Sequence, residues 1–459
     1  MKKMICIISM MIIVLLLTIP CIAENSVYGD FIYTILSDGS AEITGYQGTD
    51  TDITIPAVID NTPVTSVGTA AFSHNEMIES VSFPDSVLSI GDHCFVECTA
   101  LQKVDLPSHL QWLGDLVFQG DIKLNEITLP KSLVRIGMNP FDRCSSLDEV
   151  ILSGDNIYYS TENGVLYDLK AKALISYPAA KSDNDYTIPD WVNKIAAAAF
   201  SENIYINEVT IPEKVTEITG NPFCGCISLK NLDISPFNTM FETHENSLYN
   251  RETRELIAYL WNSEAESFSV RPSVKSIGNE AFYKHHELKK IELPSSIVTI
   301  GDAAFADSGL VSIKLPDSVT TLGVSAFSDC QDLETVKLPS GLTRIERYTF
   351  SECKALKSID LPKFLNSIGE GAFYKCESLS ELELPANLRF IGDYAFLSCS
   401  GLQSVIFPDY LYSIGKGAFF DIENLTVTVA PGSLAEEWAQ KNEIQYERKN
   451  VTYINSETA

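Results

Sequence analysis

Phenylalanine recurs along this chain at a nearly fixed interval, and that interval limits what the chain can fold into. Successive members of the series are 23 residues apart, once 22, except at two places where the step is 59. The thirteen residues are Phe72, Phe95, Phe118, Phe141, Phe200, Phe223, Phe282, Phe305, Phe327, Phe350, Phe373, Phe396 and Phe419. A fixed period in this range indicates a solenoid, in which one small structural unit is stacked many times.

Each copy carries an apolar frame around its phenylalanine. The copy that starts at Leu333 continues with Val336, Leu338, Pro339, Leu342, Ile345, Phe350 and Cys353. Apolar residues two positions apart predict a short strand, and the proline ends it because it cannot donate to a ladder. A second short extended segment and a helical or irregular turn follow. The phenylalanine is expected to fill the core of each coil, which is stable only when stacked on its neighbours.

Two steps of 59 residues leave 36 extra residues each. The two insertions resemble each other at an offset of 82, over residues 159–177 and 241–259. Residues 165–168 and 174–177 predict two strands joined by a tight polar turn. We therefore expect hairpins set into the solenoid.

The two ends of the chain predict processing and capping. Lys2 and Lys3, an apolar run over 4–19 and small residues at 21–23 are typical of a secretory signal, so residues 1–23 are expected to be removed. Residues 24–54 predict a β-hairpin cap, and residues 55–429 the solenoid, with insertions near 153–187 and 235–269. Residues 430–459 predict a cap and tail, because Ser433 and Glu436 form a capping box for a helix through about Gln440.

Net charge excludes some partners. Without Lys2 and Lys3, 31 basic residues remain against 61 acidic ones, a formal charge of −30. Such a chain repels nucleic acid and anionic membrane, which bind clustered lysine and arginine. No later apolar run is long enough to span a bilayer, so we expect no transmembrane anchor in the mature chain.

Catalytic and metal-binding patterns are weak. Seven cysteines stand three residues after a repeat phenylalanine, and we interpret them as small buried fillers. Disulfides between neighbouring coils are within reach, although equivalent side chains of parallel coils point the same way. Two groups could hold a metal by residue type, Cys224 with Cys226, and His93 and Cys94 with Cys98, but their spacing lacks the second pair of a metal motif. We predict no enzyme, no cofactor and no metal site.

One cluster departs from the acidic average. Five lysines fall on consecutive coils at positions expected to face outward from the strands: Lys289, Lys290, Lys314, Lys337 and Lys357. The strands are expected to form the concave sheet of the solenoid. The lysines there are candidates for a basic stripe that binds an acidic partner or a glycan, although a chance grouping would look the same.

The repeat Leu-Pro-x-x-Leu-x-x-Ile-Gly-x-x-Ala-Phe-x-x-Cys resembles that of the BspA-type bacterial leucine-rich-repeat proteins, which are secreted or displayed at the surface. The resemblance extends over nearly the whole mature chain, including the insertion at 162–167. It implies a β-rich leucine-rich-repeat solenoid, a right-handed curved stack of 23-residue coils with short parallel strands, helical turns and hairpin insertions.

Two functions are compatible with these observations. The resemblance favours a secreted, non-enzymatic binding protein that recognises an extracellular protein or glycan through its concave sheet, as in adhesion to host or neighbouring cells. The alternative is a structural component of the cell envelope or extracellular matrix, for which acidity and regular stacking would suffice.

Overall fold

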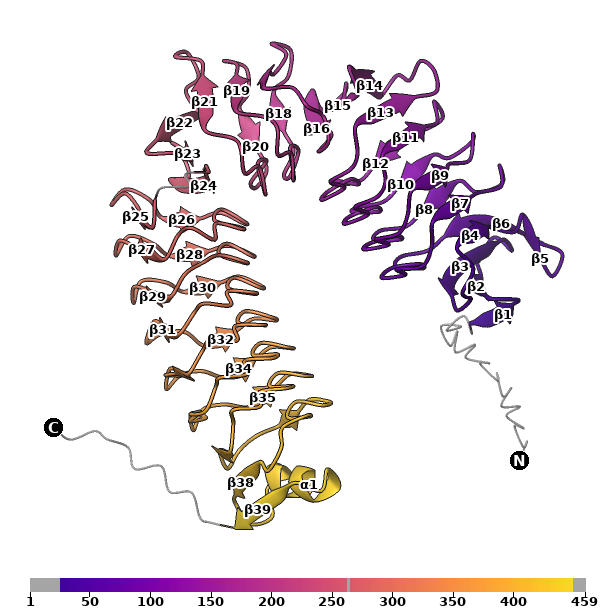
Figure 1. Ribbon diagram of the computed structural model, residues 1–459. Helices are drawn as coiled ribbons and strands as arrows, with labels where there is room; N and C mark the ends of the chain where they lie inside the picture. Colours follow the sequence, from indigo (N-terminus) through magenta and orange to yellow (C-terminus); the bar gives the residue numbers. More distant parts are fainter. Residues whose placement is uncertain (1–24, 262–264, 449–459) are drawn as a thin grey trace, which may run out of the picture.

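The chain forms an arch of stacked coils (Figure 1). A computed structural model describes residues 25–261 and 265–448, so the signal sequence predicted for residues 1–23 lies outside the described residues. Three segments follow one another along the arch: residues 25–158, 159–240 and 241–448. We call them the first, second and third segments.

Most coils contribute one short strand to a parallel sheet that we call the outer sheet. The middle residue of such a strand points inward, as in β29 (Ser312–Lys314), where Ile313 is buried between two exposed residues. In the first segment these strands are β4 (Asp52–Thr54), β7 (Ser80–Ser82), β9 (Lys103–Asp105), β11 (Glu126–Leu129) and β13 (Glu149–Leu152). In the second they are β17 (Asp185–Thr187), β19 (Glu208–Ile211) and β21 (Asn231–Ile234). The third has β25 (Ser267–Ser269), β27 (Lys290–Glu292), β29, β31 (Thr335–Lys337), β33 (Ser358–Ile359), β36 (Ser404–Ile406) and β38 (Thr426–Val429).

A second parallel sheet, the flank sheet, follows from the Leu-x-x-Ile-Gly part of the repeat. A glycine follows most of these strands, and at such a position coils can touch closely: a Cβ on Gly369 would lie 2.6 Å from the backbone nitrogen of Arg347. The first segment has β6 (Thr62–Val67), β8 (Ser89–Ile90), β10 (Trp112–Leu113) and β12 (Arg135–Ile136), with β5 (Val58–Ile59) antiparallel to β6. The second has β18 (Lys194–Ile195) and β20 (Glu217–Ile218). The third has β26 (Ser276–Ile277), β28 (Thr299–Ile300), β30 (Thr321–Leu322), β32 (Arg344–Ile345), β34 (Ser367–Ile368), β35 (Phe390–Ile391) and β37 (Ser413–Ile414).

The remaining side of each coil is a turn around the repeat phenylalanine. The residues two before and two after Phe350 both adopt left-handed backbone angles, with φ of 56° at Tyr348 and 59° at Glu352. The Phe350 N–H donates to the carbonyl oxygen of Ala372 in the next coil at 2.8 Å. Helical turns were therefore the wrong expectation: the described phenylalanine turns contain hydrogen-bonded bends and no helix.

The phenylalanines form the stacked core that their spacing predicts. All thirteen are at most 5% exposed. Ring centroids of neighbouring coils lie 5.5 Å apart on each side of Phe350. A tyrosine extends the stack at the start of each segment, since Tyr46 lies 5.7 Å from Phe72, Tyr177 lies 5.0 Å from Phe200 and Tyr259 lies 5.3 Å from Phe282.

Each segment opens with a three-stranded antiparallel meander. These are β1 (Ser26–Tyr28), β2 (Phe31–Ile35) and β3 (Ala41–Tyr46) in the first segment, and β14 (Tyr159–Glu162), β15 (Val165–Asp168) and β16 (Ala173–Ser176) in the second. The third has β22 (Phe241–His244), β23 (Ser247–Asn250) and β24 (Glu255–Tyr259). The last strand of each meander pairs in parallel with the first flank strand of its segment, and every meander has a bulge in the same place. The insertions are thus internal copies of the amino-terminal cap.

The apolar core is divided into three clusters, and the internal meanders separate them. In the second meander, Leu166 and Ile175 pack into the core of the first segment, whereas Tyr167 and Leu174 belong to that of the second. The third meander divides its residues in the same way between the second and third cores. One face of each internal meander therefore closes a segment, and the other opens the next.

The arch bends where segments meet, and the phenylalanine turns lie on the inner side of the bends. Asp142 accepts a hydrogen bond from Ser201 at 2.6 Å across the first junction. The Glu280 carbonyl accepts one from Asn221 at 2.8 Å across the second. Arg143 of the first segment donates to the Glu280 carboxylate at 2.9 Å, so all three segments meet on this side.

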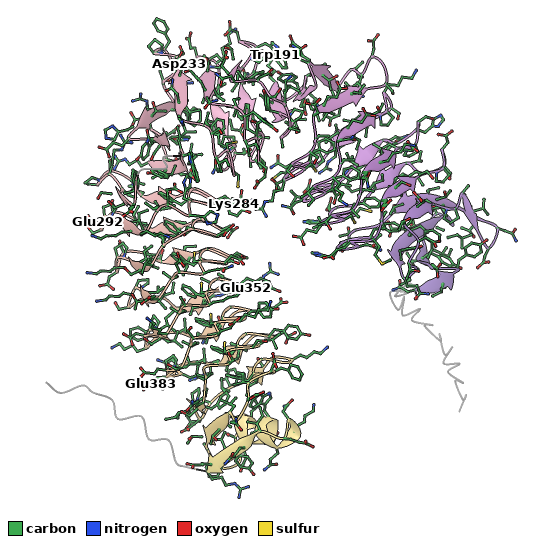
Figure 2. All side chains as sticks on the ribbon, in the orientation of Figure 1. Trp191, Asp233, Lys284, Glu292, Glu352 and Glu383 are labelled. Atoms are coloured by element: carbon green, nitrogen blue, oxygen red, sulfur yellow. The ribbon has the colours of Figure 1, made fainter. Side chains whose placement is uncertain are left out.

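The outer sheet consequently follows the convex side of the arch, and its expected concave position was wrong. Figure 2 shows Glu292 and Glu383 of this sheet on the outer edge, while Lys284 and Glu352 of the turns lie on the inner edge. Contacts between turn residues, which the repeat alone does not predict, pull the inner edge together at each junction.

The carboxyl end is covered by a helix and a strand. Helix α1 (Leu434–Lys441) begins at Ser433, whose hydroxyl accepts from the backbone N–H of Glu436. The Glu436 carboxylate accepts from the N–H of Gly432 at 2.7 Å. Strand β39 (Gln445–Arg448) extends the outer sheet beside β38. Within the described residues no helix has the length and apolarity that crossing a bilayer requires.

Candidate binding face

The five candidate lysines lie together on the outer sheet of the third segment. Lys290, Lys314 and Lys337 belong to β27, β29 and β31, and Lys289 and Lys357 immediately precede β27 and β33. Because these strands lie on the convex side, the lysines face away from the arch. The structure therefore brings the predicted residues onto one face, but not onto the concave one.

Three of the five lysines are neutralised by nearby carboxylates. Lys289 pairs with Asp332 at 3.0 Å, Lys290 with Glu292 at 2.8 Å and Lys357 with Glu334 at 2.7 Å. Exposed pairs of this kind add little stability, but they cancel charge locally. A continuous basic stripe is therefore absent from the described surface. Lys290 and Glu292 are two residues apart on β27, but the partners in the other two pairs lie on different coils, which sequence spacing does not reveal.

Lys314 and Lys337 are different. They are directly opposite each other in the register of β29 and β31, and both are exposed. Neither forms an ion pair with any residue that the structure describes. The carboxylate of Glu292, next along the face, is already held by Lys290 and by the Ser269 hydroxyl at 3.3 Å. Two like charges opposite each other are unfavourable without a counter-ion.

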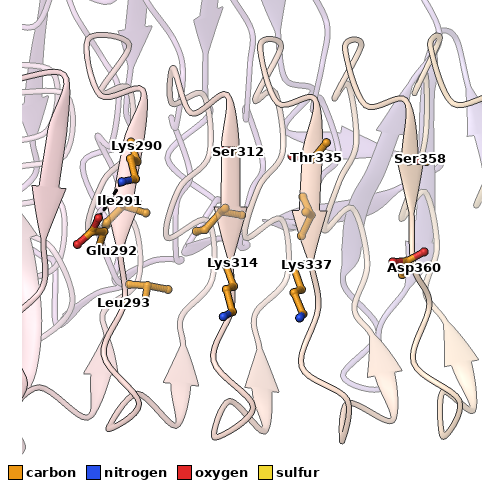
Figure 3. A pocket seen from close by; sticks show the side chains of 12 residues that line it. Lys290, Ile291, Glu292, Leu293, Ser312, Lys314, Thr335, Lys337, Ser358 and Asp360 are labelled. Carbon is orange, nitrogen blue, oxygen red and sulfur yellow. Dashed lines mark hydrogen bonds and ion pairs between the residues drawn. The ribbon is translucent and has the colours of Figure 1, made fainter.

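An open groove of about 680 Å³ lies over these strands (Figure 3). Ser312, Thr335 and Ser358 form a row of hydroxyls in mutual register along it. Lys314 and Lys337 form a second row, which Glu292 and Asp360 border. The outward side chains of the groove are thus polar: the two unpaired ammonium groups lie in the middle, Asp360 on one side, and the paired Lys290 and Glu292 on the other.

Asp317 lies close enough to Lys314 and Lys337 for their charges to affect the pKa of its carboxyl. Hydrogen bonds from the backbone and hydroxyl of Ser340 lower the pKa of the Asp317 carboxyl, and the charges of Lys337 and Lys314 lower it further. The backbone bond from Ser340 measures 3.0 Å. Asp317 is therefore ionised and engaged by Ser340.

A second exposed surface escaped the sequence analysis. Three aromatic residues gather beside the flank sheet near the carboxyl end: Phe390, Tyr410 and Tyr412, which are 43%, 69% and 66% exposed. The Arg389 guanidinium lies 5.9 Å from the Tyr410 ring and 6.0 Å from the Tyr412 ring. The 23-residue offset places Arg389 and Tyr412 at one repeat position, which was the available signal.

The inner side of the bend holds a cavity of about 450 Å³ lined by Arg143, Tyr283, Asp307 and Asp329, among others. Burial raises the pKa of the Asp307 carboxyl, and His286 and Lys284 oppose the shift. Arg143 is committed to Glu280 and also covers the Tyr283 ring at 4.7 Å. The chemistry here is that of a junction between segments.

The cysteines are buried and chemically quiet. All nine in the described residues are free thiols. Each of the seven in the repeat column donates to the carbonyl of the preceding coil's phenylalanine, as Cys353 does to Phe327 at 3.1 Å. Burial raises the pKa of the Cys330 and Cys399 thiols to about 12, which disfavours the nucleophilic thiolate. No three potential metal ligands come together in the described part of the chain.

The family follows from these repeats. The chain belongs to the BspA-type leucine-rich-repeat family, whose model matches residues 62–170, 179–258, 257–351 and 332–437. Proteins of this family are typically surface proteins, and their fold is generally a non-catalytic binding scaffold. No curated protein matches the chain.

The chain is similar to several solved structures, of which the first supports the fold. A leucine-rich-repeat protein of Eubacterium ventriosum is 19% identical, with a TM-score of 0.50, over 86% of this chain and 94% of its own. A leucine-rich cell surface protein of Faecalibacterium prausnitzii is 25% identical over 83% of this chain and 94% of its own, with a TM-score of 0.39. The pneumococcal vaccine antigen PcpA is 20% identical over 94% of this chain and 99% of its own, with a TM-score of 0.42.

Proposed function

We propose that this protein is a secreted, non-enzymatic binding protein that attaches to an anionic extracellular partner through the outer sheet around Lys314 and Lys337. The observation that carries the proposal is the pair of opposed, exposed ammonium groups without a carboxylate partner among the described residues, in a groove of an otherwise acidic molecule. An anion bound between them would relieve their repulsion and add attraction.

Family membership supports a role in binding at a surface, and the Faecalibacterium protein is described as a cell surface protein. The signal sequence predicted for residues 1–23 supports export. A purely structural role in an envelope or matrix is the alternative. That role would use the regular stacking and would not depend on two particular lysines.

Binding of the labelled mature chain to intact extracellular matrix tests the proposal. We expect saturable binding that the double variant Lys314→Glu and Lys337→Glu reduces at least tenfold. A matched control reverses two paired lysines, Lys289→Glu and Lys357→Glu, with the same change in net charge and a smaller expected loss. Equal losses in the two variants would show that only net charge matters, and unsaturable binding would favour the structural role.

Thermal unfolding of both variants provides a necessary check. Exposed charges contribute little to stability, so the unfolding midpoints should stay near that of the parent protein. A large drop would attribute the loss of binding to unfolding. In that case, Lys314→Gln and Lys337→Gln remove the charges without introducing repulsion by new carboxylates.

A further inference from the structure

The polar groove over the third segment has a charge pattern that selects among anions. Along one row, the outward side chains are Glu292, Lys314, Lys337 and Asp360 on four successive strands or coils. Neighbouring strands of a sheet are about 4.8 Å apart, so the two ammonium groups span a short distance and carboxylates stand on both sides. A ligand with charges in a long row would meet repulsion at Asp360 and would gain nothing at the Lys290–Glu292 pair, whose charges cancel.

The pattern therefore fits a single, isolated negative charge. Two ammonium groups on adjacent strands match the two oxygens of one carboxylate, with one donor for each oxygen. Figure 3 shows the Lys314 and Lys337 side chains extending side by side in the same direction. The Lys290 ammonium is already engaged by Glu292, so it does not extend the positive charge.

The rest of the groove is suited to hydroxyl groups. Ser312, Thr335 and Ser358 offer hydroxyls that both donate and accept, one on each strand. Glu292 and Asp360 at the borders accept hydrogen bonds, and Asp360, which has no ion pair among the described residues, also repels anions. A ligand with one acidic group flanked by hydroxyls satisfies all of these positions together.

An acidic peptide fits less well. Protein partners usually bind through buried aromatic or aliphatic anchors, with tyrosine, tryptophan and arginine dominant. The side chains that face outward in this groove include no aromatic residue; of its apolar members, Ile291, Ile313 and Val336 are at most 6% exposed, and Leu293 is partly buried against the core. The sheet edge is also unavailable here, because β29 and β31 are paired on both sides.

We infer that this groove binds an acidic sugar unit, a carboxylated saccharide that carries one negative charge among hydroxyls. The carboxylate lies between Lys314 and Lys337, and sugar hydroxyls contact Ser312, Thr335 and the bordering carboxylates. This inference rests on the proposed function and specifies its ligand. It also predicts that long polyanions bind less well than an isolated sugar acid.

Titration of the mature protein with 3′-sialyllactose, followed by NMR or calorimetry, tests the inference. Neutral lactose tests the need for the charge, 3′-sulfolactose tests carboxylate against sulfate, and heparin represents a polyanion. We expect sialyllactose to bind with a Kd at least tenfold lower than that of lactose or sulfolactose. Binding of lactose with equal affinity, or no binding of sialyllactose up to millimolar concentration, would overturn the inference.

Matched variants locate the site. Lys314→Gln and Lys337→Gln should each weaken sialyllactose binding at least fivefold, whereas the paired-lysine control Lys357→Gln should change it less than twofold. Asp360→Asn should increase heparin binding, because it removes a bordering negative charge. Unchanged heparin binding in that variant would contradict the role assigned to the border.

The two proposals fail separately. If sialyllactose does not bind but matrix binding still depends on Lys314 and Lys337, the ligand class is wrong and the binding face stands. If neither depends on these lysines, both proposals are wrong. A sulfolactose preference would contradict the carboxylate while leaving the binding face intact.

Discussion

The amino-terminal meander and the two internal meanders have the same arrangement of strands and the same bulge. They differ on the far face, which is the face that points away from the segment that the meander opens. In the internal copies, Leu166 and Leu248 are fully buried against the preceding segment. Ile32 is the register equivalent in the first copy and is only half-buried. Thr44 likewise replaces Ile175 and Ile257 on the third strand. A meander with a partly polar far face thus covers the end of the solenoid, whereas a meander with an apolar far face joins two segments.

This difference explains how one repeat type produces three cores in one chain. A meander interrupts the stack of phenylalanine rings, yet it supplies a tyrosine for the next stack and leucine and isoleucine for the previous core. The segments are therefore coupled through meanders rather than through continuous stacking. Single substitutions in a meander should therefore weaken the coupling between neighbouring segments.

The largest effect is expected from removing a ring within a stack. Phe350 is fully buried between two other rings, so Phe350→Ala should cost about 3–5 kcal/mol. Phe72 is near the amino terminus, but Tyr46 and Phe95 cover both of its faces at 5.7 and 5.1 Å. We therefore expect Phe72→Ala to cost nearly as much.

Urea unfolding monitored by hydrogen exchange, segment by segment, measures both losses. Each variant should destabilise its own segment most, because the cores are separate. Uniform loss across all three segments would contradict the independence of the cores. A negligible loss for Phe72→Ala alone would show that the first meander does not complete the stack.

The difference between the meanders is tested most directly by shortening a side chain on the far face of an internal meander and the equivalent side chain of the first meander. Leu248→Ala removes a fully buried side chain between the second and third segments and should cost about 2–5 kcal/mol. The matched variant Ile32→Ala alters the half-buried equivalent in the first meander and should cost less. If both cost the same, the far face of the first meander has a partner like that of the internal ones.

The contacts on the inner edge of the arch, where segments meet, should affect how strongly the arch is bent. Arg143→Leu leaves Asp142 and Glu280 without their cation, and leaving a buried polar group without its partner costs about 1–3 kcal/mol, or more where the group is charged. Burial already raises the pKa of the Glu280 carboxyl, and Arg143 opposes that shift. Small-angle X-ray scattering should show a wider arch. Arg135→Leu, at an exposed site over Trp112, serves as the control and should leave the shape unchanged.

The repeat sequence predicts what repeats, and this was sufficient for the coil, the phenylalanine core and the family. Its period also located the insertions. Curvature could not be predicted in the same way, because it depends on contacts such as Arg143 to Glu280, which are 137 residues apart in sequence. The candidate site shows the same limit: the five lysines were found by spacing, but the neutralisation of Lys289 by Asp332 and of Lys357 by Glu334 is visible only in three dimensions.

The residues three positions after each repeat phenylalanine form a column of small buried side chains, which we call the filler column. This column requires hydrogen-bond donors, which the sequence did not show. Most of its described members donate a hydrogen bond to the preceding coil: thiols do so to a phenylalanine carbonyl, and the Asn203 amide does so to the carbonyl oxygen of Pro178 at 3.1 Å. Asp121 occupies this column in the first segment and is fully buried. One of its oxygens accepts from the Cys98 N–H at 2.8 Å, and the other has no described partner. A protonated Asp121 would supply the missing donor.

The last effect is expected at this residue, and it depends on pH. Burial raises the pKa of the Asp121 carboxyl to about 9, with the Cys98 N–H opposing and Glu97 adding to the shift. The folded state thus prefers the protonated form. Its contribution to stability is complete below the unfolded pKa of about 4 and declines as the pH rises, until the folded pKa is reached. The slope cannot exceed about 1.4 kcal/mol per pH unit.

Asp121→Asn keeps a donor in the column and removes the titration. We expect this variant to flatten the decline in the stability of the first segment between pH 5 and 9, about the range between the unfolded and folded pKa values. The third segment should titrate as in the parent protein, because its core is separate from that of Asp121. Hydrogen exchange at several pH values resolves the two segments, and Asp105→Asn on the exposed face of β9 is the control. If the parent and Asp121→Asn proteins have parallel pH profiles, Asp121 is ionised in the folded state. If both segments respond together, the meanders couple the cores more tightly than their packing indicates.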